Sequence, residues 1–369
     1  MQPAWSGSRQ YAAMRPRGAM PSMTPSEIVR RLDEGVVGQA QAKKVLAVAV
    51  YTHFRKSARA LAHDNGAGGT GVLTKSNILL IGSTGTGKTL LCETLSRILQ
   101  IPFVTADATT LAQSQYVNEE IEAILQRLLD KAGGDVARAQ RGIVFIDEVD
   151  KLKSVDEGAR GNAGVSVQHA LLKIMEGSQV RLQGGVYIDT THILFICGGA
   201  FVGLSKIIEN SQSYGYLSLS DHDNHEILDR LGARIKPTDL HAFGLVPEFA
   251  GRLPVIARLE DLTREMLVRI MVEPRDSLYR QYRELLQADG VELVIKPVVF
   301  EQIAEIAMDY KVGARSLRGL FEELLVDVLY RIPDNPAIRK VSFNSLFEPP
   351  VYSGVQPAGA SSAKPAAPG

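Results

Sequence analysis

The sequence has few cysteines and no excess of charge of either sign. Of its 369 residues only Cys92 and Cys197 are cysteines, and they lie far apart in apolar segments. This argues against a disulfide framework and a cysteine zinc site, so we expect no zinc, and it suits a cytoplasmic location. Lysine plus arginine and aspartate plus glutamate are both 41. No global field therefore recruits nucleic acid or an anionic membrane.

Long apolar runs are missing as well. No run approaches the roughly 20 residues that a membrane-spanning helix needs. The first residues carry Arg9, Arg15 and Arg17 without an apolar stretch, which is not the pattern of a secretory signal. Residues 1–23 are rich in Met, Pro, Ser and Arg and lack periodicity, so we predict a disordered arm. A basic transit-like peptide is the alternative interpretation of this segment.

A glycine-rich motif follows an apolar segment at residues 77–81 and matches the phosphate-binding pattern G-x-x-x-x-G-K-[ST]. Its glycines let backbone N–H groups close around phosphate oxygens, and the following helix adds a favourable dipole. Lys88 would neutralise phosphate charge, and the Thr89 hydroxyl would bind Mg²⁺. A chance loop is the alternative, which the flanking strand and helix disfavour. The residues expected to bind nucleotide here are Gly82, Ser83, Thr84, Gly85, Thr86, Gly87, Lys88, Thr89 and Leu90.

A second motif at residues 141–151 places acidic residues after a short apolar run. The run delivers Asp147 and Glu148 to the C-terminal end of a strand, where open α/β sheets bind their ligands. Asp147 would hold Mg²⁺ through water, and Glu148 would polarise the attacking water as general base. An acidic turn after a buried strand is common on its own. Downstream of a phosphate loop it indicates NTP hydrolysis.

Strands and helices alternate through the first two thirds of the chain, which predicts a parallel α/β sheet covered by helices on both faces. After about residue 260 the pattern becomes helix-rich, beginning with one long helix that Thr263 would cap and that ends near Ala288. We therefore predict a large α/β domain at 24–260 and a smaller α+β domain at 261–350. A tail rich in Pro, Ala, Gly and Ser at 351–369 is predicted to be disordered.

With these motifs in place, the chain from about Thr24 to Phe343 resembles the ClpX family of AAA+ protein unfoldases, which partner the ClpP peptidase. The matching segments include residues 75–82, 106–111, 193–201 and 247–254. HslU is a related alternative, but the amino-acid sequence of residues 197–201 is closer to that of ClpX. The resemblance implies an AAA+ P-loop NTPase that hydrolyses ATP to pull polypeptide through the pore of a homo-hexameric ring.

The same resemblance assigns further roles. Arg252 looks like the arginine finger that reaches a neighbouring subunit's ATP, and Arg315 looks like the second sensor arginine from the small domain. Val36 and Val37 would line the adenine pocket. Outside the family context these arginines would be interpreted as solvated surface residues. A trans-acting arginine requires a heterologous interface, so a closed ring is implied.

Departures from the family pattern fall in the substrate loops. Tyr116 and Val117 would grip an extended polypeptide, but the glycines that flank this pair in the family are absent, so we expect reduced loop mobility. The second pore loop, at residues 177–189, is shortened and keeps Arg181 as its only cation. The family's N-terminal zinc-binding domain has no counterpart in this sequence.

The docking segment for a peptidase also departs from the family's Ile-Gly-Phe tripeptide. Its best candidate is Tyr214-Gly215-Tyr216, which brings hydroxyl groups into an apolar cleft, so we predict that coupling to a ClpP-type peptidase is weak or absent. Co-adapted clefts on a matched peptidase are the opposing interpretation. The alternative function is a divergent AAA+ ring that remodels or binds a dedicated partner, with ATP as an assembly switch and no peptidase coupling.

Overall fold

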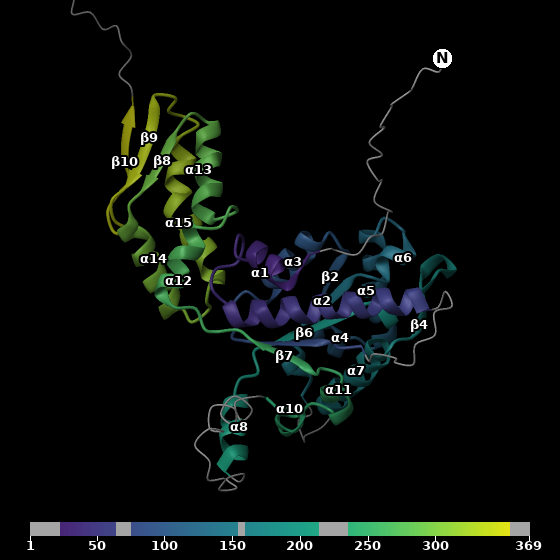
Figure 1. The fold of residues 1–369 in the computed structure, drawn as a ribbon. Coiled ribbons are helices and arrows are strands. Elements are labelled where there is room, and N and C mark those ends of the chain that lie inside the picture. The colour runs from purple at the N-terminus through teal and green to yellow at the C-terminus, as the bar shows by residue number, and fades with distance from the viewer. Residues whose placement is uncertain (1–22, 64–74, 154–158, 214–234, 355–369) are drawn as a thin grey trace, which may run out of the picture.

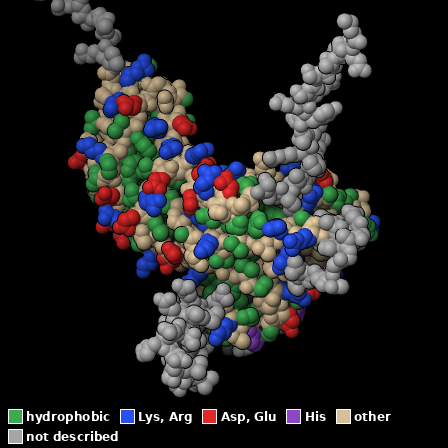
Figure 2. All heavy atoms as spheres, in the orientation of Figure 1, with side chains coloured by type: hydrophobic (Ala, Val, Ile, Leu, Met, Phe, Trp, Pro, Cys, Tyr) green, Lys and Arg blue, Asp and Glu red, His purple; other side chains and the backbone are tan. Residues whose placement is uncertain are grey.

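The computed structural model describes residues 23–63, 75–153, 159–213 and 235–354. Within them, the elements from α1 to β7 surround a five-stranded sheet, and those from α12 onward surround a three-stranded sheet. Figure 1 shows these two groups as separate bodies, with α2 crossing the larger one. Figure 2 shows acidic and basic side chains interspersed on the visible face, as the balanced composition leads one to expect.

The large body begins with helices and then alternates strands with helices. Its β-strands are β1 (Ile78–Ile81), β2 (Phe103–Asp107), β3 (Ile143–Asp147), β4 (Gln179–Arg181), β5 (Tyr187–Asp189), β6 (Leu194–Gly199) and β7 (Val255–Arg258). Its α-helices are α1 (Pro25–Leu32), α2 (Ala40–His63), α3 (Lys88–Leu99), α4 (Ala108–Gln113), α5 (Val117–Lys131), α6 (Val136–Ala139), α7 (Ala159–Glu176), α8 (Leu204–Ser213), α10 (Pro237–Phe243) and α11 (Pro247–Gly251). Short 3₁₀ turns are η1 (Val149–Leu152), η2 (Gln183–Gly185) and η3 (Thr190–His192).

The large sheet has the strand order β2-β3-β6-β1-β7, and every pairing in it is parallel. Its central strands are apolar on both faces, which suits a sheet buried on both sides. Alternate residues of β1 enter different cores: Leu79 and Ile81 pack with α5 and α7, whereas Ile78 and Leu80 pack with α1, α2 and α3. The predicted fold class is therefore confirmed.

The small body contains α12 (Arg264–Val272), α13 (Leu278–Ala288), β8 (Glu292–Ile295), α14 (Pro297–Asp309), α15 (Arg315–Arg331), β9 (Ile338–Phe343) and β10 (Val351–Gly354). The prediction of one long helix from Thr263 to Ala288 is wrong, because the structure divides it into α12 and α13. Pro274 lies in the break and has no backbone N–H to continue a helix. The break sends Arg275 and Asp276 toward the large body, which matters for the site described below.

The predicted start of the disordered tail at Val351 is also wrong. Residues 351–354 form β10, which pairs antiparallel with β9. Tyr352 packs partly against the small core, and the Arg331 guanidinium lies 5.9 Å from the centre of its ring. Composition predicted disorder here, whereas one aromatic side chain and an open sheet edge order the segment.

Candidate nucleotide-binding and hydrolysis site

The phosphate-loop motif forms a turn between β1 and α3. Gly82 follows β1 directly, and its amide donates to the Gly199 carbonyl at the end of the neighbouring β6. Gly87 occupies the N-cap of α3 with φ of 95°, a left-handed conformation that glycine adopts without strain. The Lys88 ammonium donates to the carbonyls of Gly82 at 2.7 Å and Ser83 at 3.2 Å. The loop therefore curls around the lysine at the N-terminus of a helix.

Lys88 is buried at the bottom of this turn. Burial lowers the pKa of Lys88 below its usual value, while the charges of Asp147 and Asp150 act in the opposite direction. Burial disfavours the positive charge of the Lys88 ammonium, and a bound phosphate would supply the negative charge that compensates it. A buried ammonium at a helix N-terminus is therefore suited to bind a polyanionic phosphate. The geometry thus suits the phosphate chain of a nucleotide.

The acidic motif lies at the end of β3, beside the start of α3. The Thr89 hydroxyl donates to Asp147 Oδ2 at 3.3 Å, so the two oxygens predicted to bind Mg²⁺ are neighbours. The other Asp147 oxygen accepts the backbone N–H of Glu148 at 2.9 Å. Hydroxyl and carboxylate oxygens are ligands that Mg²⁺ accepts, and this ion usually takes its remaining ligands from phosphate and water. The residues present therefore fit a magnesium-nucleotide complex.

Glu148 has a left-handed backbone with φ of 59° and ψ of 31°. This conformation costs about 1 to 3 kcal/mol for a residue with a side chain and persists only where the surroundings impose it. Here the Glu148 amide is tied to Asp147, and its carbonyl accepts the Lys151 amide at 2.9 Å. This left-handed residue turns the chain away from β3 immediately after Asp147.

The end of β6 contributes residues that sequence reasoning did not single out. A side chain at Gly198 would meet the Phe145 ring at 2.7 Å and Asp147 Oδ1 at 3.1 Å, so only glycine leaves room for the aspartate. The next glycine, Gly199, makes the same room for Asp150. Asp150 is buried, accepts the Phe201 amide at 3.3 Å, and has one oxygen with no hydrogen-bond donor. The sequence did contain a signal for Asp150, because this residue belongs to the acidic motif at residues 141–151.

A cleft of about 680 Å³ opens from the phosphate loop between the two bodies. The large body contributes Val36, Val37 and Leu90, together with the loop residues Gly85, Thr86 and Gly87. Both valines are buried, so they form an apolar wall next to the phosphate-binding turn. An apolar wall beside a polar phosphate site matches a nucleotide, whose base is flat and apolar on its faces.

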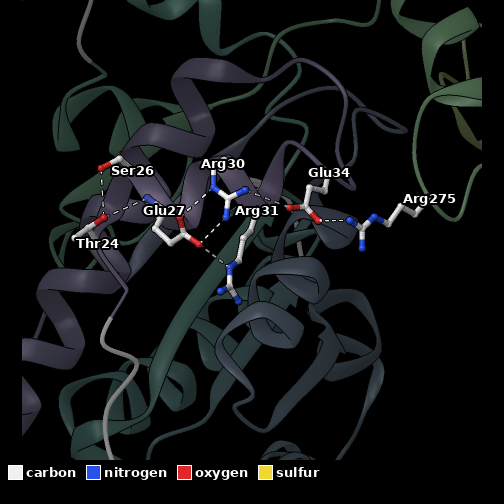
Figure 3. Close-up of polar contacts among 7 residues, drawn as sticks. All are labelled: Thr24, Ser26, Glu27, Arg30, Arg31, Glu34 and Arg275. Atoms are coloured by element: carbon white, nitrogen blue, oxygen red, sulfur yellow. Dashed lines mark hydrogen bonds and ion pairs between the residues drawn. The ribbon is translucent and has the colours of Figure 1, made fainter.

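Arg31, Glu34 and Arg275 line this cleft, and Figure 3 shows the polar contacts that they make with one another and with their neighbours. In α1, Glu27 accepts hydrogen bonds from Arg30 and Arg31, which lower the pKa of Glu27 to about 2. Glu34 lies 3.8 Å from Arg30 and 3.5 Å from Arg275 of the small body. Exposed ion pairs contribute about 0 to 1 kcal/mol each. The Glu34–Arg275 pair across the cleft therefore adds little to the contact between the two bodies.

The small body also contacts the phosphate loop directly. The Ala314 amide donates to the Gly85 carbonyl at 3.3 Å. A Cβ atom on Gly85 would lie 2.2 Å from the Val312 carbonyl oxygen, so the approach requires glycine. Arg315 follows at the start of α15, lines the cleft, and acts on the Lys88 pKa through its charge. The structure thus brings Arg315 to the site of its own chain.

Arg252 lies elsewhere. It follows α11, and its carbonyl accepts a hydrogen bond from the Asn77 side chain at 3.2 Å. Asn77 precedes β1 whereas Gly82 follows it, so Arg252 is next to the opposite end of the strand from the phosphate loop. At about 3.3 Å per residue the two ends are roughly 16 Å apart. Arg252 therefore does not join the other predicted residues within one chain.

The two residues predicted to contact substrate, Tyr116 and Val117, have different surroundings. Tyr116 is 64% exposed at the N-cap of α5, but Val117 is the first residue of that helix and packs partly against the large core. The predicted second pore loop is a hairpin of β4 and β5, on which Arg181 is exposed. The hairpin also exposes Tyr187, which sequence reasoning missed. Residues 214–216 lie outside the described part of the chain.

Two family models match the chain. Residues 73–256 match the AAA domain (Cdc48 subfamily), and residues 262–340 match the C-terminal, D2-small domain, of ClpB protein. Together with the phosphate loop and the acidic strand end, these matches define an AAA ATPase: a nucleotide-hydrolysing enzyme with a large α/β domain and a small C-terminal domain.

Known relatives narrow this class. An ATP-dependent Clp protease ATP-binding subunit ClpX 3 of Methylococcus capsulatus is 44% identical over 359 residues, covering 91% of this chain and 82% of that protein. ClpX of Treponema denticola is 41% identical over 355 residues, covering 91% and 84%, and ClpX of Azotobacter vinelandii is 43% identical over 354 residues, covering 91% and 79%. The chain belongs to the ClpX family, as the resemblance predicted. The alternative of a ring that uses ATP only as a switch is not favoured.

Among residues 23–63, 75–153, 159–213 and 235–354, no helix is both long enough and apolar enough to cross a membrane.

Proposed function

We propose that this ATPase unfolds proteins by pulling polypeptide through the pore of a homo-hexameric ring, and that hydrolysis of Mg²⁺-ATP drives the pulling. The observation that carries the proposal is the joint position of Lys88, Thr89 and Asp147 at one edge of the sheet, with Glu148 directly after them. Its relatives are named ATP-binding subunits of the Clp protease. Because this chain belongs to the same family, we expect it to have the same class of activity, the ATP-dependent unfolding of proteins.

In this mechanism each side chain has a distinct task. Lys88 and the loop amides bind the phosphates, and Thr89 and Asp147 hold the metal, which supplies charge neutralisation at the phosphates. Glu148 accepts a proton from the attacking water, and its strained backbone keeps it beside Asp147 rather than in a continuing strand. Arg315 reaches the nucleotide from the small domain of the same chain.

Arg252 acts on the nucleotide of a neighbouring subunit. The support is its position at the end of β1 that is remote from its own phosphate loop. One chain therefore supplies the loop and the base, and the next supplies the arginine. Such an arrangement closes only in a ring with a heterologous interface.

Complementation between inactive variants tests this division. Arg252→Ala and Glu148→Gln subunits should each hydrolyse ATP poorly as pure rings. Mixed rings should regain turnover, most strongly near equal ratios, because an intact Glu148 then meets an intact Arg252 from the neighbour. The matched control mixes Arg252→Ala subunits with Glu148→Gln/Arg252→Ala subunits, which should stay inactive. Failure of the first mixture to exceed this control at every ratio would refute action in trans.

Tyr116 is the proposed contact with substrate. ATP turnover should rise when an unfolded polypeptide is added, and Tyr116→Ala should remove that stimulation while leaving turnover without substrate unchanged. Phe347, an exposed aromatic residue beyond β9, provides the control, since Phe347→Ala removes a similar ring without touching the proposed pore. Equal stimulation in both variants would contradict the assignment of Tyr116.

A ClpP-type peptidase is the proposed partner in a reducing cytoplasm. Tyr214 and Tyr216 make the contact, and the expectation that docking is weak stays a prediction. A pull-down with the host's peptidase and a slowly hydrolysed ATP analogue tests it. Tight binding that disappears in a Tyr214→Ala/Tyr216→Ala variant would show that the tyrosines dock well and would overturn the expected weakness.

A further inference from the structure

Arg252 has a carboxylate partner within its own chain. The guanidinium Nη2 atom lies 2.7 Å from Oε1 of Glu176, the last residue of α7. Each of these side chains is 42% exposed, so the pair sits at the surface without being fully solvated. Both partners of this ion pair belong to the same chain.

A buried asparagine holds the backbones that carry this ion pair. Asn77 is 1% exposed, and its Nδ2 atom donates to the carbonyl of Arg252 at 3.2 Å and to that of Met175 at 3.4 Å. Met175 immediately precedes Glu176. One amide at the start of β1 therefore ties the residue that carries the guanidinium to the neighbour of the residue that carries the carboxylate.

The other side of Glu176 is held as well. Gly177 has φ of 108°, and a side chain there would meet the Thr191 hydroxyl at 2.7 Å, so only glycine makes this turn. The Thr190 hydroxyl is fully buried, donates to the Ile174 carbonyl at 2.8 Å and accepts the Ser178 amide at 2.9 Å. The end of α7 is thus fixed before and after Glu176.

We infer that Glu176 is a positioning residue that orients Arg252 for the neighbouring subunit's nucleotide; the inference rests on the proposed trans role of Arg252. A guanidinium carries five N–H donors over three nitrogens, and the shortest contact of this ion pair is made by Nη2. A carboxylate that binds one edge of the guanidinium leaves other donors for acceptors such as phosphate oxygens. The carboxylate restricts a long side chain that otherwise loses much rotamer freedom when it binds.

The size of the effect follows from the exposure of the pair. Exposed ion pairs contribute about 0.2 to 1 kcal/mol, which corresponds to roughly a 1.4- to fivefold change in rate. Glu176→Ala should therefore lower kcat by about 1.4- to fivefold. It should leave nucleotide affinity unchanged, because an arginine finger stabilises charge that develops in the transition state. Glu176→Asp, which keeps the charge on a shorter side chain, should recover part of the loss.

Mixed rings separate this role from a structural one. Glu176→Ala is placed either in the Glu148→Gln subunit, which donates Arg252, or in the Arg252→Ala subunit, which hosts the hydrolysing site. If Glu176 positions Arg252, the restored turnover falls about 1.4- to fivefold in the first arrangement and stays unchanged in the second. Glu301→Ala in the first arrangement is the control, because Glu301 forms a similarly exposed pair with Arg264 at 3.2 Å.

The outcomes distinguish this inference from the proposed function. If the mixture without Glu176→Ala regains no turnover, the trans role of Arg252 fails and the positioning role with it. Turnover can also be regained while Glu176→Ala lowers it equally in both arrangements, or lowers it in neither of them. In both cases the trans role of Arg252 stands and Glu176 does not position Arg252.

Discussion

Replacing Thr190 with valine isolates one hydroxyl that holds the end of α7. The Ile174 carbonyl is among the last four of the helix, which lack partners within it, and Ser178 is the residue whose amide a longer helix would have offered. The Thr190 hydroxyl stands between the two, at 2.8 Å from the carbonyl and 2.9 Å from the amide. Valine has nearly the same shape but bonds neither group.

The expected cost follows from what valine leaves unpaired. A buried donor or acceptor without a partner costs about 1 to 3 kcal/mol. Thr190 is fully buried, but Ser178 is half-buried, so water recovers part of the loss at its amide. We expect Thr190→Val to weaken the junction between α7 and the β4–β5 hairpin by about 2 to 4 kcal/mol. Opening of the hairpin should become roughly 30- to 1,000-fold more frequent.

Hydrogen exchange of the hairpin amides measures this opening, since local unfolding exposes them without global denaturation. Thr191→Val is the matched control: Thr191 is exposed, and surface substitutions of this kind usually change stability by less than about 0.5 kcal/mol. Equal exchange rates in the two variants would show that the Thr190 hydroxyl does not hold the junction. The positioning of Glu176 would then lack its support on that side.

Three further predictions concern the site and its surroundings. Lys88→Ala should lose ATP binding, measured by titration with a fluorescent nucleotide, and retained normal affinity would contradict the phosphate-loop assignment. Gly85→Ala should separate the small domain from the loop, since its new methyl group meets the Val312 carbonyl at 2.2 Å and alanine resists φ of 83°; we expect a loss of about 1 to 2 kcal/mol from the backbone alone, seen in thermal unfolding. Burial lowers the pKa of His53 to about 4, so the unfolded chain binds the proton first and stability falls as pH drops from about 6.5 to 4. His53→Gln keeps a donor for the His192 carbonyl and should flatten this part of the denaturation profile, and an unchanged slope would refute the assignment to His53.

The nucleotide site was predictable because its chemistry is encoded locally. A glycine-rich turn after an apolar strand makes a phosphate loop wherever it folds, and an acidic pair after another strand arrives at the same edge of a parallel sheet. Lys88 and Asp147 therefore lie close together because the carboxyl ends of parallel strands share one edge of the sheet. The break at Pro274 also had a local signal, although the periodicity around it favoured a continuous helix.

Other features depend on contacts between residues far apart in the sequence. Nothing near Arg252 indicates that Asn77 ties it to the end of β1 remote from the phosphate loop, or that Glu176 meets it there. Likewise, β10 exists only because β9 leaves an edge for it. From the residues alone one can predict the groups for phosphate, metal and water, because each lies in a short motif, and the family resemblance adds the roles expected of the two arginines. The positions of these arginines come from the fold: Arg315 lines the cleft of its own chain, whereas Arg252 lies at the other end of β1, because each position depends on which end of a strand the residue packs against.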